Sequence, residues 1–336
     1  MKRILLIVLA LAAALLLFSC SGGTDVPADP FGQNSTEQPQ SSESKNEAPV
    51  STAPADEPSA AESNEPTPDQ PSEADPDGPG PGGTATGAET EGLGIKVYDS
   101  GCEVWDIGTF TGTALSIPSH VNGIPVTTIE EDALSNDTMV SLEIPWTVRS
   151  IGEEAVSGSH ALETVIFYKG LIGIGYGAFA DCTALKTVEL PTTLERLGGS
   201  AFRSCTALTE VTLDCNPEIG SRAFSECSAL EKVSFVGKSF RTYSLQSSAF
   251  EFDTALKEAV FSEGLEKIDS YCFSGCTSLG TIYLPVTLKT VSANAFSGVG
   301  TLKVYYGGSE EQWKSVSIAN GNDALSNAEI LYSQKW

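Results

Sequence analysis

The sequence has 336 residues, of which 44 are acidic and 19 basic, giving a net charge of −25. This excess of acid excludes the usual mode of nucleic-acid binding, because contacts between basic side chains and phosphates supply most of that affinity. The composition is also uneven: residues 21–93 hold 12 of the 18 prolines, whereas 94–336 carry 29 acidic and 16 basic residues. We therefore expect segments with different physical properties rather than one uniform domain.

Residues 1–20 have the pattern of an export signal. Lys2 and Arg3 precede an apolar run from Ile4 to Phe18, which is about 22 Å long as a helix and too short for a bilayer core of about 30 Å. The L-F-S-C segment that ends at Cys20 resembles the lipobox of bacterial lipoproteins, in which the chain is cut before an acylated cysteine. We predict lipidation of Cys20; the alternative is a plain cleaved signal with an incidental cysteine.

The composition of residues 21–93 is typical of a tether. They are rich in acid, Pro and Ser and contain one aromatic residue, Phe31. Such a composition cannot bury enough apolar surface to offset the entropy cost of ordering, so we predict a disordered acidic spacer. It would hold the following domain away from a membrane anchor.

The sequence beyond the tether is periodic. Two regular copies read I-G-Y-G-A-F-A-D-C-T-A-L-K-T-V-E-L-P at 174–191 and L-G-G-S-A-F-R-S-C-T-A-L-T-E-V-T-L at 197–213. Successive copies are spaced by 22, 23, 23, 22, 26, 23 and 23 residues. The large apolar residue that marks each copy, here called the Phe slot, is Leu134, Val156, Phe179, Phe202, Phe224, Phe250, Phe273 or Phe296.

The template predicts a stacked coil. In L-x-x-V-x-L the alternating apolar residues point to one face of a short strand, and Pro145, Pro191 and Pro285 end such strands because proline cannot donate to a ladder. A repeat of 23 residues is too short for a full helix-strand unit, so we expect short helical turns and loops on the convex side. One coil cannot bury its apolar face alone, and stacking creates a continuous core.

The pattern I-G-x-x-A-F-x-x-C-x-x-L-x-x-V-x-L-P resembles the BspA-like leucine-rich repeat family of bacterial surface proteins. This resemblance implies a repeat solenoid with a parallel β-sheet on its concave face, exposure at the cell surface, and binding, often adhesion. The expected organisation is a lipoprotein signal peptide over 1–20, the tether over 21–93, an N-terminal cap over 94–128, about eight repeats over 129–304, and a C-terminal cap over 305–336. In that last cap, Ser309 and Gln312 fit a capping box that starts a short helix carrying Trp313 and Val316 onto the last coil.

Seven cysteines follow Cys20, and four of them share one position of the repeat, here called the Cys slot. We expect buried free thiols there, with a disulfide or a metal site as the alternatives, because stacked thiols point in parallel and do not converge. Cys272 replaces the alanine of its copy and is expected in the core, whereas Cys102 and Cys215 lie off the template and are candidates for solvent exposure. The Cys slot holds Cys182, Cys205, Cys227 and Cys276 in four copies, and Asp137, Ser159, Asp253 and Val299 in the others.

The sequence carries no recognised catalytic arrangement. Its two histidines, His120 and His160, stand beside no motif, and there is no H-E-x-x-H, no G-x-S-x-G and no phosphate-binding loop. We therefore expect a protein that is not an enzyme and that has no cofactor or metal; an enzyme is the less favoured alternative.

The outward-pointing residues of the predicted strands are the candidate ligand-binding face. Aromatic and aliphatic groups among acids are typical of a protein-binding surface, and the alternative is a solvated sheet without a ligand. The candidates are Glu143, Ile166, Tyr168, Glu189, Glu210, Thr212, Lys232 and Tyr283.

The expected partner is an extracellular protein with a basic patch, and a glycan or the cell wall is the alternative. Tyr168 and Tyr283 lie five copies apart, or about 24 Å along a sheet, which favours a folded protein as ligand. The C-terminal cap around Tyr305 and Trp313 is a second candidate surface. Membrane contact is expected through the N-terminal lipid only, which predicts an exported lipoprotein anchored on the bacterial cell surface.

Overall fold

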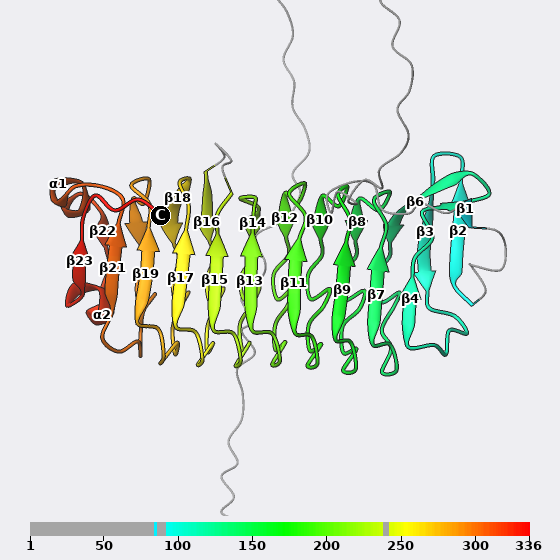
Figure 1. Cartoon of the computed structure of the whole chain (residues 1–336), viewed down its shortest axis with the longest axis horizontal. Helices are drawn as coiled ribbons and strands as arrows, with labels where there is room; N and C mark the ends of the chain where they lie inside the picture. The colour runs from blue at the N-terminus through cyan, green and yellow to red at the C-terminus, as the bar shows by residue number, and fades with distance from the viewer. Residues whose placement is uncertain (1–83, 86–91, 238–241) are drawn as a thin grey trace, which may run out of the picture. The chain divides into compact units, whose positions relative to one another are not determined.

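The structure, a computed structural model, describes residues 84–85, 92–237 and 242–336. The predicted signal peptide and almost all of the predicted tether lie outside these residues. The described chain winds into successive coils, and the repeated coils each give one strand to each of two sheets (Figure 1). The predicted fold class, a repeat solenoid with a parallel sheet, is confirmed.

The first sheet has ten strands, and all of its neighbouring strands run parallel. Eight of them contain the V-x-L part of the template, and one further strand at each end comes from the predicted caps. In chain order the strands are β4 (Ala114–Ser116), β7 (Ser141–Ile144), β9 (Thr164–Phe167), β11 (Thr187–Leu190), β13 (Glu210–Leu213), β15 (Lys232–Phe235), β17 (Glu258–Phe261), β19 (Thr281–Leu284), β21 (Lys303–Tyr306) and β23 (Glu329–Leu331).

The second sheet has thirteen strands and was not anticipated from the sequence. In most coils it contains only two residues per strand, too few for a visible period-two pattern. Its repeat strands are β8 (Ser150–Ile151), β10 (Gly173–Ile174), β12 (Arg196–Leu197), β14 (Glu218–Ile219), β16 (Tyr243–Leu245), β18 (Leu265–Ile268), β20 (Thr290–Val291) and β22 (Ser317–Ile318).

The N-terminal end of the thirteen-stranded sheet breaks the parallel pattern. Strands β2 and β3 pair antiparallel, as do β5 and β6, whereas β3 pairs parallel with β6 and leads into the stacked coils. The strands of this end are β1 (Thr84–Ala85), β2 (Gly94–Tyr98), β3 (Gly101–Asp106), β5 (His120–Val121) and β6 (Ile124–Ile129).

Several strands of the ten-stranded sheet end where proline was predicted to end them. Pro145, Pro191 and Pro285 each stand directly after the last residue of β7, β11 and β19, so proline ends these strands as expected. The longer spacing of the fifth copy falls in the connection between β15 and β16. It leaves the register of β15 intact, whereas the pairing of β16 with β18 shifts register between Tyr243 and Ser244.

The convex side consists of turns, with almost no helix. Two positions of each turn region, two residues before and two residues after the Phe slot, repeatedly adopt positive φ, as at Ser200 (56°) and Ser204 (59°). A left-handed residue interrupts a right-handed helix. The amides instead donate to the next coil, as from Phe179 N to Ala201 O over 2.8 Å. Inter-coil bonding therefore replaces the intrahelical bonds of the expected helical turns.

A ladder of stacked rings occupies the core between the two sheets. The Phe-slot rings are at most 1% exposed, and their planes are nearly parallel over most of the array. Ring centroids are 5.2 Å apart for Phe179–Phe202 and 5.5 Å for Phe202–Phe224, and they remain between 5.1 and 5.5 Å up to Phe296. The ladder confirms the predicted register of the repeat.

Close approach of neighbouring coils explains the glycine after the short strand. A Cβ placed on Gly198 would lie 2.4 Å from the carbonyl carbon of Gly175 in the preceding coil. No real side chain tolerates such a distance to backbone, so backbone crowding accounts for the glycine here.

The predicted capping box is present in the C-terminal segment, which also adds one strand, β22 or β23, to each sheet. Helix α1 (Glu310–Lys314) starts with a capping box in which Ser309 and Gln312 bond reciprocally. It places Trp313 and Val316 in buried positions on the last coil, and Trp313 packs edge-on against Tyr306. A second short helix, α2 (Asp323–Ser326), precedes β23.

The Phe ladder gives the first prediction. Replacing Phe179 with Ala should reduce the free energy of unfolding by about 3–5 kcal/mol, because a buried ring is lost that stacks on Phe202 and packs edge-on against Phe167. Thermal melting measures the effect. Phe252→Ala is the matched control, since Phe252 is 52% exposed and lies outside the Phe slot. A Phe179→Ala midpoint equal to that of the wild type would show that the assigned register is wrong.

Candidate binding surface

The outer face of the ten-stranded sheet presents two rows of side chains, because alternate residues of every strand point away from the core. Strand register links each row across the sheet. The first row is Ala114, Ser141, Thr164, Thr187, Glu210, Lys232, Glu258, Thr281, Lys303 and Glu329. The second row is Ser116, Glu143, Ile166, Glu189, Thr212, Ser234, Val260, Tyr283, Tyr305 and Leu331.

Seven of the eight candidate residues lie in these rows. Glu210 and Lys232 are neighbours in the first row, and the second row holds Glu143, Ile166, Glu189, Thr212 and Tyr283. Tyr168 differs, because it follows the end of β9 and is half-buried, with its amide donating to Ile144 O over 3.2 Å.

Some charged side chains of this face form ion pairs, and others do not. On β15 and β17, Lys232 Nζ lies 2.8 Å from Glu258 Oε1, and this hydrogen bond raises the pKa of Lys232 above its usual value. Glu189 and Glu210, on the adjacent strands β11 and β13, are exposed. Neither of them makes an ion pair within the described part of the chain. The middle of the face therefore carries an excess of negative charge, which Lys232, opposite Glu210, offsets only in part.

The C-terminal end of the second row is aromatic. The rings of Tyr283 and Tyr305 stack with centroids 4.6 Å apart, and Trp336 packs edge-on against Tyr283 at 5.6 Å. Lys303 Nζ lies 5.5 Å from the centre of the Tyr305 ring, in cation–π geometry. The second candidate surface is thus divided: Tyr305 belongs to the outer face, whereas Trp313 is buried and unavailable to a ligand.

Trp336 is the residue that sequence reasoning missed. It lies outside the repeat template, and only the fold-back of the final residues brings it over the sheet. Ser333 N donates to Gly308 O over 2.8 Å, and Gln334 N donates to Tyr306 O over 3.0 Å. These bonds extend the chain along β21 and leave Trp336 46% exposed. A tryptophan just beyond the last apolar strand was the signal available in the sequence.

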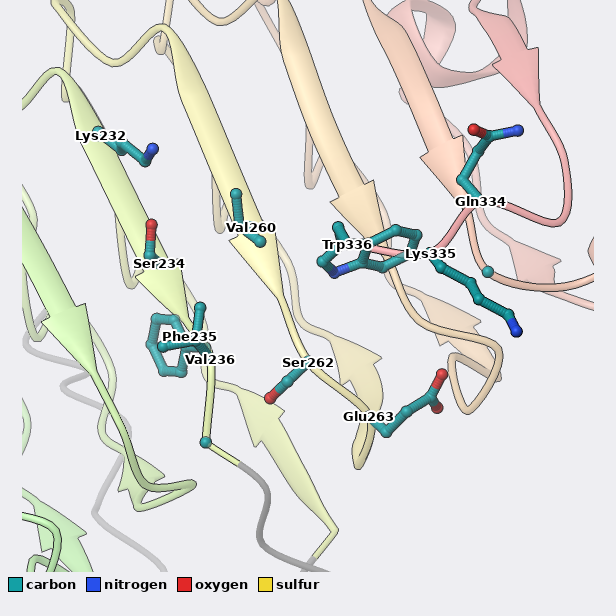
Figure 2. Close-up of a pocket in the computed structure, with 12 residues that line it drawn as sticks. Lys232, Ser234, Phe235, Val236, Val260, Ser262, Glu263, Gln334, Lys335 and Trp336 are labelled. Atoms are coloured by element: carbon teal, nitrogen blue, oxygen red, sulfur yellow. The ribbon is translucent and has the colours of Figure 1, made fainter.

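A pocket opens beside Trp336, over β15 and β17 (Figure 2). Its volume is about 750 Å³. Apolar groups are supplied by Val236, Val260 and Trp336, and polar groups by Lys232, Ser234 and Ser262 among others.

The cysteines form a buried ladder on the turn side. All seven described cysteines are free and buried. The expected exposure of Cys102 and Cys215 was wrong, because both are buried. Cys102 lies in β3, and Cys215 lies in the connection after β13, where its thiol faces Pro191 O of the preceding coil over 3.6 Å. Cys272 lies in the core as predicted. The Cys-slot thiols donate to a carbonyl of the preceding coil, as Cys182 to Val156 O (3.4 Å), Cys205 to Phe179 O (3.2 Å), Cys227 to Phe202 O (3.1 Å) and Cys276 to Phe250 O (3.0 Å).

Burial also determines the reactivity of these thiols. Desolvation raises the pKa of Cys182 to about 12 and that of Cys215 to about 11. The thiolate is the reactive and metal-binding form, so both side chains are inert near neutral pH. Within the described residues, no group of three or more His, Cys, Asp or Glu side chains is placed to hold a metal ion.

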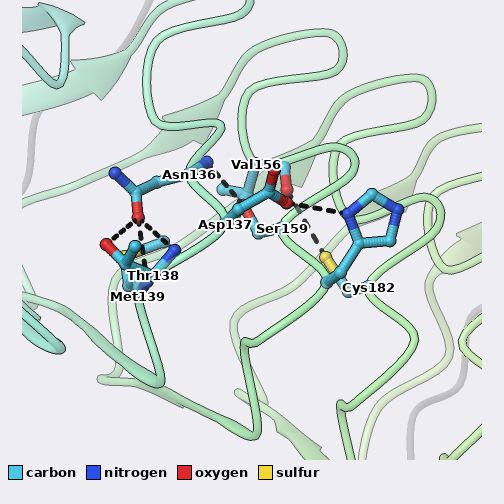
Figure 3. Close-up of polar contacts among 8 residues, drawn as sticks. Asn136, Asp137, Thr138, Met139, Val156, Ser159 and Cys182 are labelled. Atoms are coloured by element: carbon cyan, nitrogen blue, oxygen red, sulfur yellow. Dashed lines mark hydrogen bonds and ion pairs between the residues drawn. The ribbon is translucent and has the colours of Figure 1, made fainter.

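The first copy departs from the predicted Cys slot (Figure 3). Asn136, rather than Asp137, continues the slot, because its amide donates to Ser159 Oγ of the next coil over 3.0 Å. Asn136 Oδ1 in turn accepts from Thr138 and Met139 amides over 2.8 Å. Asp137 instead points outward and pairs with His160 over 2.8 Å. This copy has one residue fewer between its Phe slot and the next apolar residue, which shifts the register by one.

Asp253 is an anomalous member of the Cys slot. Its side chain is fully buried; Oδ1 accepts the Cys227 amide over 2.8 Å, and Oδ2 has no hydrogen-bond partner in the described structure. Desolvation raises the pKa of Asp253 well above its usual range. Burial without a counter-charge therefore favours the neutral form of this carboxyl in the folded protein. Burying the carboxyl in this slot costs more free energy than burying a thiol would.

The second prediction follows from that burial. The unfolded chain releases the Asp253 proton at about pH 4, whereas burial favours retention of the proton in the folded chain. The free energy of unfolding of the wild type should therefore fall as the pH rises above that value. At about pH 4, Asp253→Cys should raise the free energy of unfolding by about 1–3 kcal/mol, because the variant removes a buried polar atom that lacks a hydrogen-bond partner. The gain should grow between pH 4 and 7 by up to about 1.4 kcal/mol per pH unit.

Urea denaturation at several pH values measures both effects. Asp214→Asn is the control, since Asp214 is an exposed aspartate that should give a curve close to that of the wild type. Parallel pH dependences of wild type and Asp253→Cys would contradict the neutral, buried carboxyl.

The stacked coils define a leucine-rich-repeat solenoid, and comparison with known families specifies it. A family model described as "BspA type Leucine rich repeat region" matches six copies, over residues 127–244 and 243–315. This match spans more than half of the chain, so the protein belongs to the BspA-type leucine-rich repeat family, as its sequence pattern predicted.

Two solved structures show the same fold. A leucine-rich repeat protein of T. pallidum aligns with a TM-score of 0.52 and 23% identity, over 74% of this chain and 98% of that one. A leucine-rich repeat protein from Bacteroides ovatus aligns with a TM-score of 0.54 and 23% identity, over 72% of this chain and 70% of that one. No curated protein matches the sequence. Among the described residues, no helix has the length and apolar character needed to cross a membrane.

Proposed function

We propose that this protein is an exported, lipid-anchored surface protein whose solenoid binds an extracellular protein through the outer face of the ten-stranded sheet. The observation that carries the binding role is the pair of exposed acids, Glu189 and Glu210, on adjacent strands of a rigid sheet. Their excess negative charge complements a basic patch on the partner and accelerates its association. Membership of the repeat family supports binding rather than catalysis as the role of the solenoid.

The size of the proposed partner follows from the layout of the face. The acids lie on β11 and β13, and the aromatic end begins at β19, three strands beyond β13. With strands about 4.8 Å apart, a ligand that touches both regions spans about 14–19 Å. A folded protein with a surface of ordinary interface size covers such a distance. Tyr283 and Tyr305 then supply the aromatic contacts that dominate binding energy in protein interfaces.

The third prediction concerns the acidic part of the face. Glu189→Lys combined with Glu210→Lys should lower the association rate constant with an identified extracellular partner by about tenfold or more, because attraction becomes repulsion. The wild-type affinity should also fall as salt rises. Affinity capture from extracellular proteins identifies the partner, and surface plasmon resonance measures the rate constants.

A matched charge reversal on the other side of the solenoid serves as control. Glu153→Lys with Glu218→Lys changes the net charge equally at exposed positions away from the outer face, in a turn and in β14. It should leave association nearly unchanged. Binding that survives the first double reversal, or that is insensitive to salt, would move the site away from this face.

Residues 1–20 are the basis of the proposed membrane anchor, and they give the fourth prediction. Metabolic labelling with an alkyne fatty acid should tag the wild type and leave Cys20→Ser unlabelled, because the proposed acyl chain is attached to the Cys20 thiol. The label is detected in the gel after coupling to a dye. Label that persists in the variant would place the anchor elsewhere, and the absence of label in both would indicate a secreted protein.

A further inference from the structure

The pocket beside Trp336 has features of a ligand site that the acidic part of the outer face lacks. Its volume of about 750 Å³ falls within the range of about 300–1,000 Å³ that small-ligand sites occupy. Figure 2 shows its two sides: Ser234 and Val236 project from the β15 segment, and Trp336 lies beyond Val260 of β17.

Trp336 is held in place before any ligand arrives. The two tail hydrogen bonds, from Ser333 and Gln334 to the backbone of 306–308, fix the chain that carries it. Its ring rests edge-on against Tyr283, which itself stacks on Tyr305. A ligand that packs against the indole therefore orders few additional groups, which is the main advantage of a preorganised site.

The chemistry around the pocket combines a flat apolar surface with hydroxyls and with charged groups of both signs, among them Glu263 and Lys335. The indole is an apolar plane whose electron-rich face attracts weakly positive C–H groups. Ser234 and Ser262 offer hydroxyls that both donate and accept, and Lys232 offers N–H donors. The charge of Lys232 is balanced by Glu258 at 2.8 Å. This combination suits a neutral ligand that alternates C–H faces with hydroxyl groups.

The same observations disfavour an extended peptide. A peptide strand binds a sheet mainly by main-chain hydrogen bonds at an open edge. Here β15 and β17 are interior strands, and their main-chain groups already bond to each other and to β13 and β19. Apart from Gly237 and Gly307, the lining consists of residues with side chains, and these present mainly hydroxyl, apolar and charged groups.

We propose that this pocket binds a short neutral saccharide, with one sugar ring packed on the indole of Trp336 and its hydroxyls bonded to Ser234, Ser262 and Lys232. Glu189 and Glu210 lie on β11 and β13, outside the pocket lining, and only Glu210 stands directly opposite a lining residue, Lys232.

The test applies the full-length protein to a printed array of defined neutral and acidic oligosaccharides and of short aromatic peptides. Isothermal titration calorimetry then measures the dissociation constant of the best neutral oligosaccharide. Trp336→Ala should weaken this binding by about tenfold or more, equivalent to about 1.4 kcal/mol. Trp336→Phe, which keeps an aromatic plane, should retain an intermediate affinity.

Two controls separate this site from a general surface effect and from the protein-binding proposal. Trp105→Ala removes a tryptophan with the same exposure, 46%, at the other end of the chain's described part, and should leave saccharide binding unchanged. The single charge reversal Glu189→Lys should also leave it unchanged, because Glu189 lies on β11, two strands away from Lys232. Thermal melting of Trp336→Ala should match the wild type, because the side chain is half exposed.

Three results would overturn the proposal. They are the absence of binding to any neutral saccharide on the array, equal affinities of wild type and Trp336→Ala, and Trp336-dependent binding of the aromatic peptides in place of saccharides. Each of them leaves the protein-binding proposal standing, since that depends on the charge reversal and on salt.

Discussion

The stacking of each residue on its counterpart one coil earlier is the constraint on which the whole structure depends. Parallel strands lie about 4.8 Å apart, and the Phe-slot rings stack at 5.1–5.5 Å along the same direction. An inward position must therefore hold a side chain that packs against a copy of itself. This requirement explains the repeated Phe, Ala and Leu of the core. It also explains Gly198, whose missing Cβ lets the coils approach.

Outward positions escape this constraint, so they can differ from coil to coil. The second row of the ten-stranded sheet changes along its length, from Glu143 and Glu189 to Val260, Tyr283 and Tyr305, over a uniform core. The acidic middle and the aromatic end are consequently two chemically different surfaces on one rigid sheet. The two proposals, a basic protein partner for the first and a neutral saccharide for the pocket at the second, rest on this difference.

Departures from the template occur where the stacking tolerates them. Asp253 takes the place of a thiol and remains neutral, because the buried slot offers it the Cys227 amide and no counter-charge. Tyr271 and Phe252 occupy the positive-φ positions that Ser200 and Ser204 fill elsewhere, with φ of 60° and 63°. A bulky residue in that region is strained, and both rings are exposed, so neither adds the burial that would offset the strain.

The sequence by itself determined the solenoid, the register of the repeat, the strands that end at proline and the capping box at Ser309, because each depends on contacts between residues at a fixed spacing. It also identified most of the outer face, since alternation within a strand decides which side chains point outward. The tertiary structure decided the rest. Two-residue strands leave no period to detect, so the second sheet was missed. The amides of the convex turns bond between coils, which a pattern within one coil does not reveal. The burial of Cys102 depends on the pairing of β3 with β2 and β6, and that of Cys215 on packing against the preceding coil. Trp336 reaches the outer face only because the final residues fold back along β21.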